Sequence, residues 1–340
     1  MRHFLIAAIA LLFLTTTPLA WADNKVMDTS DSHTADPIFS PVQDSLIRAY
    51  ISEISQDSIG SYIKQLVSFK TRFMLADNRR QIASWIADKF RSFGYEHVVL
   101  DSFQNTVEFP LRSGKHNSTW QYNVSTCLTG HQEPSVSCVL GAHFDCVTTG
   151  PESDPYVLSP GADNNATGVA VTFEIARVLR QNRFSPENTI EFVAFGSEEF
   201  MTMFIDGTSG ANNYVERQRQ LGKSIKMMID NNQIGYAPDT AHWKLDFQNY
   251  PGAEWMTDLA HAICENYTRI IPVDTNDHML YSDARYFHEA GIPAIFFEEY
   301  LFNPHNFTDK DIPENCNMGY CTEVANISCG MLVYLNSGTQ

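Results

Sequence analysis

Apolar and polar positions along the chain repeat with two different spacings. Apolar residues recur every three to four positions over 41–67 and again over 82–93, which predicts amphipathic helices. Gly94 directly follows the second segment and is expected to end its helix. The segments 97–103 and 118–124 carry the β-branched and aromatic residues that are typical of strands.

Beyond residue 130, short apolar runs alternate with helical segments. Four such runs are found, at 136–142, 189–195, 225–231 and 294–297. Helical patterns begin at Gly168 and at Trp255. Strands that alternate with helices indicate a largely parallel sheet that is covered on both faces. We therefore expect an α/β fold in a single domain, 41–340, with irregular insertions at 149–160 and 200–210.

The beginning of the chain has a different character. A positively charged start precedes an apolar stretch, 4–14, and Ala20 and Ala22 form a small-x-small exit. This order is typical of a cleaved secretory signal, and the apolar stretch is too short to span a bilayer. We expect residues 1–22 to be a signal peptide and the polar segment 23–40 to be a flexible mature N-terminus. The protein is then expected to be secreted or periplasmic, after cleavage near Ala22, and to have no membrane span.

The composition narrows the set of partners. Forty acidic residues stand against 23 basic ones, so the formal net charge is −17. No basic surface is available to neutralise phosphates, and we expect no nucleic-acid partner. Export would permit disulfides among the seven cysteines. Cys316 with Cys321, or Cys127 with Cys138, would close short loops, but the pairing stays open, and an odd count leaves at least one thiol without a partner in the chain.

Polar signatures follow the predicted strands. The first apolar run leads to His143 and Asp145, and the second leads to Glu198 and Glu199. In open α/β sheets, ligands bind beyond the carboxyl ends of the strands. Taken singly, a His-x-Asp is more often a hydrogen-bonded pair than a ligand, and a Glu pair is usually a solvated helix start. Together they favour a hydrolytic metal site, where one Glu binds the metal and its neighbour deprotonates a bound water.

Six segments carry these signatures in a fixed order: GAHFDCV, PGADNNATG, FVAFGSEE, GKSIKMMIDNNQIGY, SDARYFHEAGIPA and NPHNFTDKD. In this order they resemble the dizinc aminopeptidases that include the bacterial leucyl aminopeptidases, with glutaminyl cyclases and glutamate carboxypeptidase as relatives. The resemblance covers residues 60–335. It implies a mixed, mostly parallel twisted sheet with helices on both faces, two zinc ions as cofactors, and a peptide substrate that loses its N-terminal residue.

The resemblance also assigns roles to individual residues. His143 matches a zinc ligand, and Asp145 matches the carboxylate that supports this histidine. Glu198 matches the catalytic base, and Glu199 matches a further zinc ligand. These four positions carry the residue types that the family uses.

Three further ligand positions are altered. The carboxylate that bridges the two metals falls at Asn164, a second aspartate falls at Asn232, and a second histidine falls at Phe307. An asparagine amide offers one neutral oxygen and cannot bridge two zinc ions with charge compensation, and phenylalanine offers no donor. One matched ligand then remains for each metal, whereas a catalytic zinc needs three protein ligands.

Residues beside the altered positions are candidate replacements. Asp163 stands one position before the first altered residue, Asp230 two before the second, and His305 two before the third. In a strand, residues two apart face the same side, so Asp230 in particular could point inward.

Three hypotheses therefore stay open. The chain is a secreted zinc aminopeptidase in which Glu198 passes a proton from a metal-bound water to the leaving amine. Alternatively, it is a catalytically inactive pseudo-peptidase that binds a peptide or a protein. A third hypothesis is a site for one metal, built from His143, Glu199 and one replacement ligand.

Overall fold

The structure is a computed structural model that describes residues 38–110, 113–199, 209–238 and 243–337. The expected signal peptide lies outside the described residues, as does most of the segment 23–40. The described residues belong to one compact unit, which begins at Ile38. Its first helix starts at Pro41, where the sequence predicts it, and the Ser40 side chain caps this helix by accepting the backbone N–H of Gln43.

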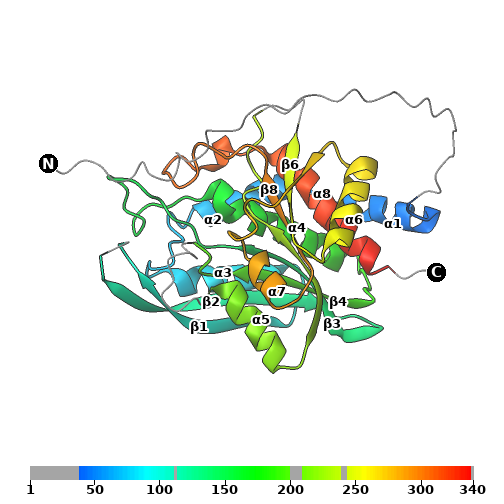
Figure 1. The fold of residues 1–340 in the computed structure, drawn as a ribbon, viewed down its shortest axis with the longest axis horizontal. Coiled ribbons are helices and arrows are strands. Elements are labelled where there is room, and N and C mark those ends of the chain that lie inside the picture. Colours follow the sequence, from blue (N-terminus) through cyan, green and yellow to red (C-terminus); the bar gives the residue numbers. More distant parts are fainter. Residues whose placement is uncertain (1–37, 111–112, 200–208, 239–242, 338–340) are drawn as a thin grey trace, which may run out of the picture. The chain divides into compact units, whose positions relative to one another are not determined.

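The centre of this unit is an eight-stranded sheet with strand order β1-β2-β4-β3-β5-β8-β6-β7 (Figure 1). Its strands are β1 (Val98–Glu108), β2 (His116–Leu128), β3 (Glu133–His143), β4 (Asn188–Phe195), β5 (Ser224–Asn231), β6 (Lys244–Asn249), β7 (Ile271–Thr275) and β8 (Ala294–Glu299). Four neighbouring pairs run parallel: β3 with β4, β3 with β5, β5 with β8, and β6 with β7. The other three pairs run antiparallel. The expected mixed, mostly parallel sheet is confirmed.

Helices cover both faces of the sheet. They are α1 (Pro41–Ile51), α2 (Gln56–Val67), α3 (Arg79–Ser92), α4 (Thr167–Gln181), α5 (Gly210–Gln220), α6 (Glu254–Tyr267), α7 (Ala284–Glu289) and α8 (Met318–Leu335). On one face, the Phe195 ring of β4 lies 5.7 Å from Tyr214 of α5 and 6.1 Å from Phe287 of α7. On the other, Phe247 of β6 packs 5.3 Å from His261 of α6. None of the helices in the described residues is long and apolar enough to cross a membrane.

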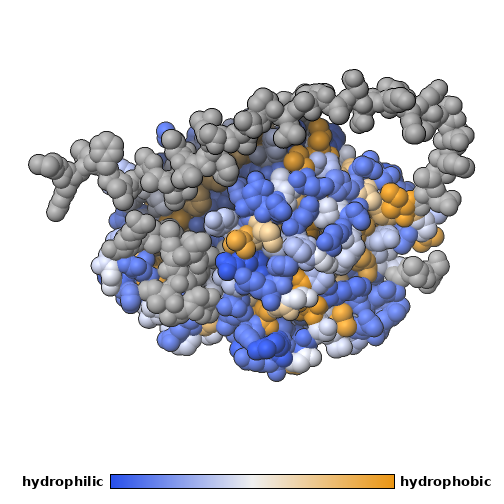
Figure 2. Space-filling view, in the orientation of Figure 1, coloured by the Kyte–Doolittle hydropathy of each residue, from blue (hydrophilic) through white to orange (hydrophobic). Residues whose placement is uncertain are grey.

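The apolar runs mark the strands at the centre of the sheet. Each of the four runs falls within one strand, β3, β4, β5 or β8, and in β4 and β8 every residue is buried. The sequence did not predict β6, β7, α5, α7 or α8. The strands β6 and β7 are short and mix polar with apolar positions, and α8 is apolar on several sides, so neither spacing stands out. The described surface in Figure 2 is mostly hydrophilic, as the acidic composition suggests.

All seven cysteines are free thiols, so the two suggested disulfides are not formed in the structure. Cys127 lies on β2 and Cys138 on β3, and β4 separates these strands, which keeps the two side chains from being direct neighbours. The Cys316 thiol instead donates to the carbonyl oxygen of Ile312 at 3.7 Å, and Cys321 is buried in the first turn of α8.

Candidate metal and active site

The four matched residues meet at the carboxyl ends of two neighbouring parallel strands. His143 is the last residue of β3 and pairs in register with Phe195, the last residue of β4. Glu198 and Glu199 follow β4 after a short turn. One ligand atom each of His143, Glu198 and Glu199 lies within 4.8 Å of the others, and all three side chains are buried. The structure therefore brings together an imidazole and two carboxylates.

Asp145 fixes the turn that carries the two glutamates. Its carboxylate accepts the backbone N–H of Glu198 at 2.9 and 3.1 Å and that of Glu199 at 3.0 Å. The nearest carboxylate oxygen lies 3.7 Å from Nδ1 of His143, and this nitrogen is closer to the main-chain oxygen of Asp145, at 3.0 Å. The imidazole is thus held mainly by a backbone oxygen, and the Asp145 side chain positions Glu198 and Glu199.

Two asparagines make direct hydrogen bonds to these donor atoms. Asn164 lies in the short segment η1 (Ala162–Ala166) ahead of α4, where its own backbone is not helical, and its Nδ2 donates to Oε1 of Glu199 at 2.7 Å. Oδ1 of Asn232 lies 3.0 Å from Nε2 of His143. The Oδ1 atom of Asn164 is buried and has no hydrogen-bond partner among the described residues. Each side chain that the resemblance places at an aspartate ligand position therefore points into the cluster.

Phe307 contributes only carbon atoms. Its ring stacks on Phe302, with centroids 6.2 Å apart, and packs against a small apolar cluster comprising Phe73, Met74, Leu75, Ala76, Val107 and Val147. The backbone of Phe307 has a φ of 61°, and its carbonyl accepts the N–H of Thr149 at 2.8 Å. The position that the resemblance assigns to a second histidine offers no metal donor.

The suggested replacements do not join the cluster. Asp163 accepts the N–H of Gly235 and Nδ2 of Asn303, each at 2.7 Å, so both carboxylate oxygens are already bound. Asp230 accepts the N–H of Ala284 at 3.2 Å. His305 is half-buried, and its recorded hydrogen bonds involve only its backbone. Among the described residues, the group of possible metal donors contains only the His143, Glu198 and Glu199 side chains.

Two positioning residues were not predicted from the sequence. The Asp311 carboxylate accepts the backbone N–H of Asp163 at 2.7 Å and that of Asn164 at 3.1 Å, which fixes the turn before α4. Arg72 is 2% exposed, and its guanidinium donates to the carbonyls of Phe144, Pro160 and Gly161 at 2.6–2.7 Å. Asp311 ends the last of the six quoted segments, which is a usable signal. Arg72 lies outside all of them.

Burial and charge shift the titration of the cluster. Burial, with help from Asp145 and Asp230, raises the pKa of Glu198 to about 7, although His143 opposes this shift. Burial and the Glu198 charge raise the pKa of Glu199 well above its usual value. Burial by itself would lower the pKa of His143, but the facing carboxylates outweigh it and raise that pKa well above the usual value. The cluster is buried and holds more acidic groups than basic ones.

These donors do not fit two zinc ions. The two-metal arrangement that the resemblance implies has a carboxylate that bridges the ions and further ligands on each side, whereas Asn164 and Asn232 supply neutral amides and Phe307 supplies no donor. The three clustered donors, His143, Glu198 and Glu199, have the chemistry for one ion at most. The chemistry of the donor set thus departs from the two-metal arrangement.

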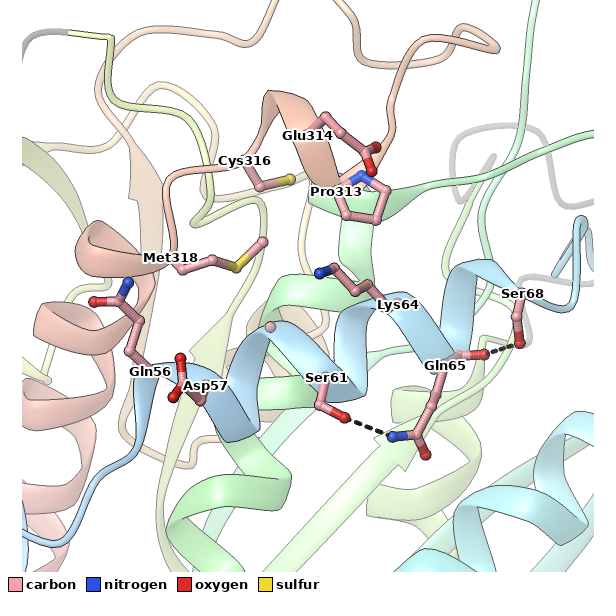
Figure 3. Close-up of a pocket in the computed structure, with 11 residues that line it drawn as sticks. Gln56, Asp57, Ser61, Lys64, Gln65, Ser68, Pro313, Glu314, Cys316 and Met318 are labelled. Carbon is pink, nitrogen blue, oxygen red and sulfur yellow. Dashed lines mark hydrogen bonds between the residues drawn. The ribbon is translucent and has the colours of Figure 1, made fainter.

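A separate cavity of about 600 Å³ lies between α2 and the segment 313–318 (Figure 3). Lys64, Glu314 and Cys316 line it together with serine and glutamine side chains. None of the clustered donors borders this cavity, so we place the candidate site at the strand ends.

Peptidase family M28 matches residues 123–332, which is more than half of the chain. The chain therefore belongs to this family, and the resemblance to zinc aminopeptidases is confirmed. Among curated proteins, a probable leucine aminopeptidase of Arthroderma otae is 23% identical over 299 residues, which cover 85% of this chain and 74% of the relative. A probable zinc metalloprotease of Pyrenophora tritici-repentis is 30% identical over 199 residues, 54% of this chain and 43% of the relative.

Solved structures share the fold at low sequence identity. The LapA aminopeptidase of Legionella pneumophila has a TM-score of 0.70 and 21% identity, covering 87% of this chain and 76% of its own. An aminopeptidase from Aneurinibacillus sp. strain AM-1 has a TM-score of 0.67 and 16% identity, covering 85% of this chain and 96% of its own. Both support the zinc aminopeptidase fold.

Proposed function

We propose that this chain is a peptide-binding protein of the M28 fold in which the two-metal peptidase chemistry has been lost. The observation that carries the proposal is the pair of amide contacts in the cluster. Asn164 occupies an oxygen of Glu199 at 2.7 Å, and Asn232 occupies Nε2 of His143 at 3.0 Å. Two of the atoms that a metal would use, Oε1 of Glu199 and Nε2 of His143, are thus already hydrogen-bonded to neutral side chains.

Charge gives the physical reason why these contacts matter. Two zinc ions carry four positive charges, and carboxylates at the Asn164 and Asn232 positions would help to neutralise them. With amides there, and with Phe307 in place of a third donor, a second ion would be held by few ligands and little opposing charge. Loss of one catalytic ion removes the two-metal chemistry while the clustered side chains remain.

The cluster of His143, Glu198 and Glu199 suits the amino end of a peptide. Buried carboxylates of Glu198 and Glu199 are good acceptors for an α-ammonium group. The relatives named as leucine aminopeptidases act at peptide N-termini by their names, which supports the same class of ligand here. The proposed partner is therefore a peptide with a free amino end.

A second candidate function is a one-metal aminopeptidase. The observation in its favour is the clustering of the His143, Glu198 and Glu199 donor atoms within 4.8 Å. Bound zinc would supply Lewis-acid polarisation of the scissile carbonyl. In that case Glu198, with a pKa raised to about 7 by burial, has the proton affinity of a general base at neutral pH.

The test is to restore the altered ligands together. The variant Asn164→Asp/Asn232→Asp/Phe307→His should bind up to two zinc ions per chain and hydrolyse aminoacyl-p-nitroanilides, whereas the wild type should bind little zinc and hydrolyse little. Each single reversion serves as a matched control and should not suffice, because it repairs only part of the two coordination spheres. Zinc is measured by elemental analysis before and after treatment with a chelator.

Two results would overturn the proposal. Robust wild-type hydrolysis with one tightly bound zinc would establish the one-metal enzyme. Robust wild-type hydrolysis that is abolished by Asp163→Ala, Asp230→Ala or His305→Ala would show that replacement ligands operate.

We further propose that the chain is exported. The support is the order of charged, apolar and small residues in 1–22, which is typical of a cleaved signal and predicts a mature chain that begins at Asp23.

A further inference from the structure

One face of the sheet carries polar side chains from the candidate site towards the β7 edge. Asp230 is in register with Gly141, two residues before His143, so both polar side chains project from the same face. Asp230 also pairs with Phe296, two residues before Glu298, and Glu298 pairs directly with Asp246 of β6. Polar side chains on this face therefore occur on β3, β5, β8 and β6, although Phe296 is the β8 residue directly beside Asp230. Figure 1 shows the strands that carry them.

The outer part of this face is not packed against α6. Phe247, which points the other way, contacts His261 of α6 and lies 4.9 Å from Phe297, so α6 occupies the opposite face. On the polar face, the nearest recorded contacts come from His278. Its Nδ1 lies 2.7 Å from Oε2 of Glu298, and its backbone N–H donates to Oε1 of Gln248 at 3.1 Å.

We call Asp246, Gln248, Thr275 and Glu298 the polar ledge. Gln248 is two residues after Asp246 and pairs with Thr275, so all four share one face. Gln248 is 1% exposed, and its Nε2 has no hydrogen-bond partner in the described part of the chain. Oδ1 of Asp246 and Oγ1 of Thr275 are likewise unpartnered there. Buried polar atoms are normally satisfied, so these three atoms point to a missing polar partner. The two oxygens accept from a donor such as a cationic side chain, whereas Nε2 of Gln248 is itself a donor and needs an acceptor such as a peptide carbonyl.

The charge of the ledge favours a cation. Asp246 and Glu298 lie directly opposite each other, and Asp277 lies nearby. Among the described residues, His278 is the basic group that contacts them, whereas the ammonium of Lys244, two residues before Asp246, lies over the Tyr300 ring at 4.6 Å. Burial, followed by the charge of Glu298, raises the pKa of Asp246 to about 6, although His278 opposes this shift. A second positive charge would relieve the repulsion between the two carboxylates. The negative net charge of the chain also favours a positively charged ligand.

We propose that the polar ledge is a subsite for a lysine or arginine side chain of the peptide that the candidate site holds. This inference rests on the proposed function. Three strand spacings separate β3 from β6, which amounts to about 14 Å. An extended peptide advances roughly 3.3 Å per residue, so a long side chain on the third or fourth residue reaches the ledge when the free amino end lies at Glu198 and Glu199.

The experiment compares two peptides that differ at one position. Fluorescently labelled Leu-Ala-Ala-Arg-Ala and Leu-Ala-Ala-Gln-Ala, with the dye at the carboxyl end, are titrated against the mature chain by anisotropy. The arginine peptide should bind roughly threefold to tenfold more tightly, as one partly solvated ion pair allows. Asp246→Asn and Glu298→Gln should each remove the difference, and thermal unfolding checks that the variants are folded.

Two further variants sharpen the comparison. His278→Gln removes the competing positive charge and should increase the preference for arginine. Asp274→Asn is the matched control, because Asp274 pairs with Phe247 on the opposite face and bonds His261 at 2.8 Å. It removes the same charge but should leave the preference unchanged.

The outcomes separate this proposal from the one on which it rests. If both peptides bind wild type equally, or if Asp274→Asn has the same effect as Asp246→Asn, the ledge is not a subsite although peptide binding stands. If neither peptide binds, or if acetylating the amino end has no effect, peptide binding as proposed here fails, and the ledge subsite fails with it.

Discussion

Replacing Arg72 by methionine should destabilise the protein more than any exposed substitution. The guanidinium is buried and bonds three main-chain oxygens, on Phe144, Pro160 and Gly161, with a longer contact of 3.4 Å to Leu66. Methionine keeps a similar length and an apolar stem, so the change removes the hydrogen bonds without opening a large cavity.

The magnitude follows from the acceptors that are left behind. The carbonyls of Phe144 and Pro160 lose this donor, which costs about 1–3 kcal/mol each, whereas the Gly161 carbonyl keeps the backbone N–H of Ala166 at 3.1 Å. Part of this cost is recovered because methionine has no charge to desolvate, so the free energy of unfolding should fall by roughly 2–4 kcal/mol. Arg72→Lys retains the charge but cannot bond three separated oxygens at once, and it should lose about half as much.

Urea unfolding followed by circular dichroism measures this difference. Arg80→Met is the matched control, since Arg80 is exposed on α3, and it should change the free energy of unfolding by less than about 0.5 kcal/mol. A loss below about 1 kcal/mol for Arg72→Met would refute the reasoning, because exposed positions vary by nearly that much.

Two other predictions concern pH and export. Burial raises the pKa of Glu198 and of Asp311 to about 7, whereas in the unfolded chain both carboxyls ionise near their ordinary values of 4.5 and 3.8. Unfolding then releases protons, so the free energy of unfolding should fall as pH rises from about 4 to 7. The melting temperature should therefore be higher at about pH 4 than at about pH 7, and Glu198→Gln should reduce this dependence on pH. A melting temperature that does not change over this range would contradict the argument from burial. N-terminal sequencing of soluble protein from its native host should begin at Asp23, and a chain that retains Met1 contradicts export.

The central strands and the clustering of His143 with Glu199 could be predicted because the sequence patterns that indicate them are local. Buried parallel strands are continuous apolar runs, and the carboxyl ends of neighbouring strands must meet, so His143 and Glu199 were expected to lie close together. Asp145 accepts the backbone N–H of Glu199 and so holds the short turn that carries it. Asp145 stands two residues after His143, so it belongs to the same local pattern.

Contacts between distant segments could not be predicted in the same way. Nothing around Arg72 in the sequence indicates that it bonds the loops at 144 and 160–161. The Asp163 carboxylate accepts hydrogen bonds from Gly235 and Asn303, which lie on two other segments that contact it only in the folded chain. The bond between His278 and Glu298 forms only because β8 lies beside the loop that carries His278. The spacing of residues along one segment does not indicate which distant segments it contacts.

The loop around Phe307 has a consequence for how such a protein can change over time. Phe307 keeps a left-handed backbone, which costs a non-glycine residue roughly 1–2 kcal/mol, so its neighbours must hold it there. Asn303 bonds Asp163 at 2.7 Å, Asn306 bonds Gln233 at 2.9 Å, and Thr149 bonds the Phe307 carbonyl. These three hydrogen bonds hold the loop in place without a contribution from a bound metal. Under the proposed function, a loop held in this way accepts a hydrophobic ring at a position where the resemblance places a ligand, and an engineered histidine at this position should leave the loop folded.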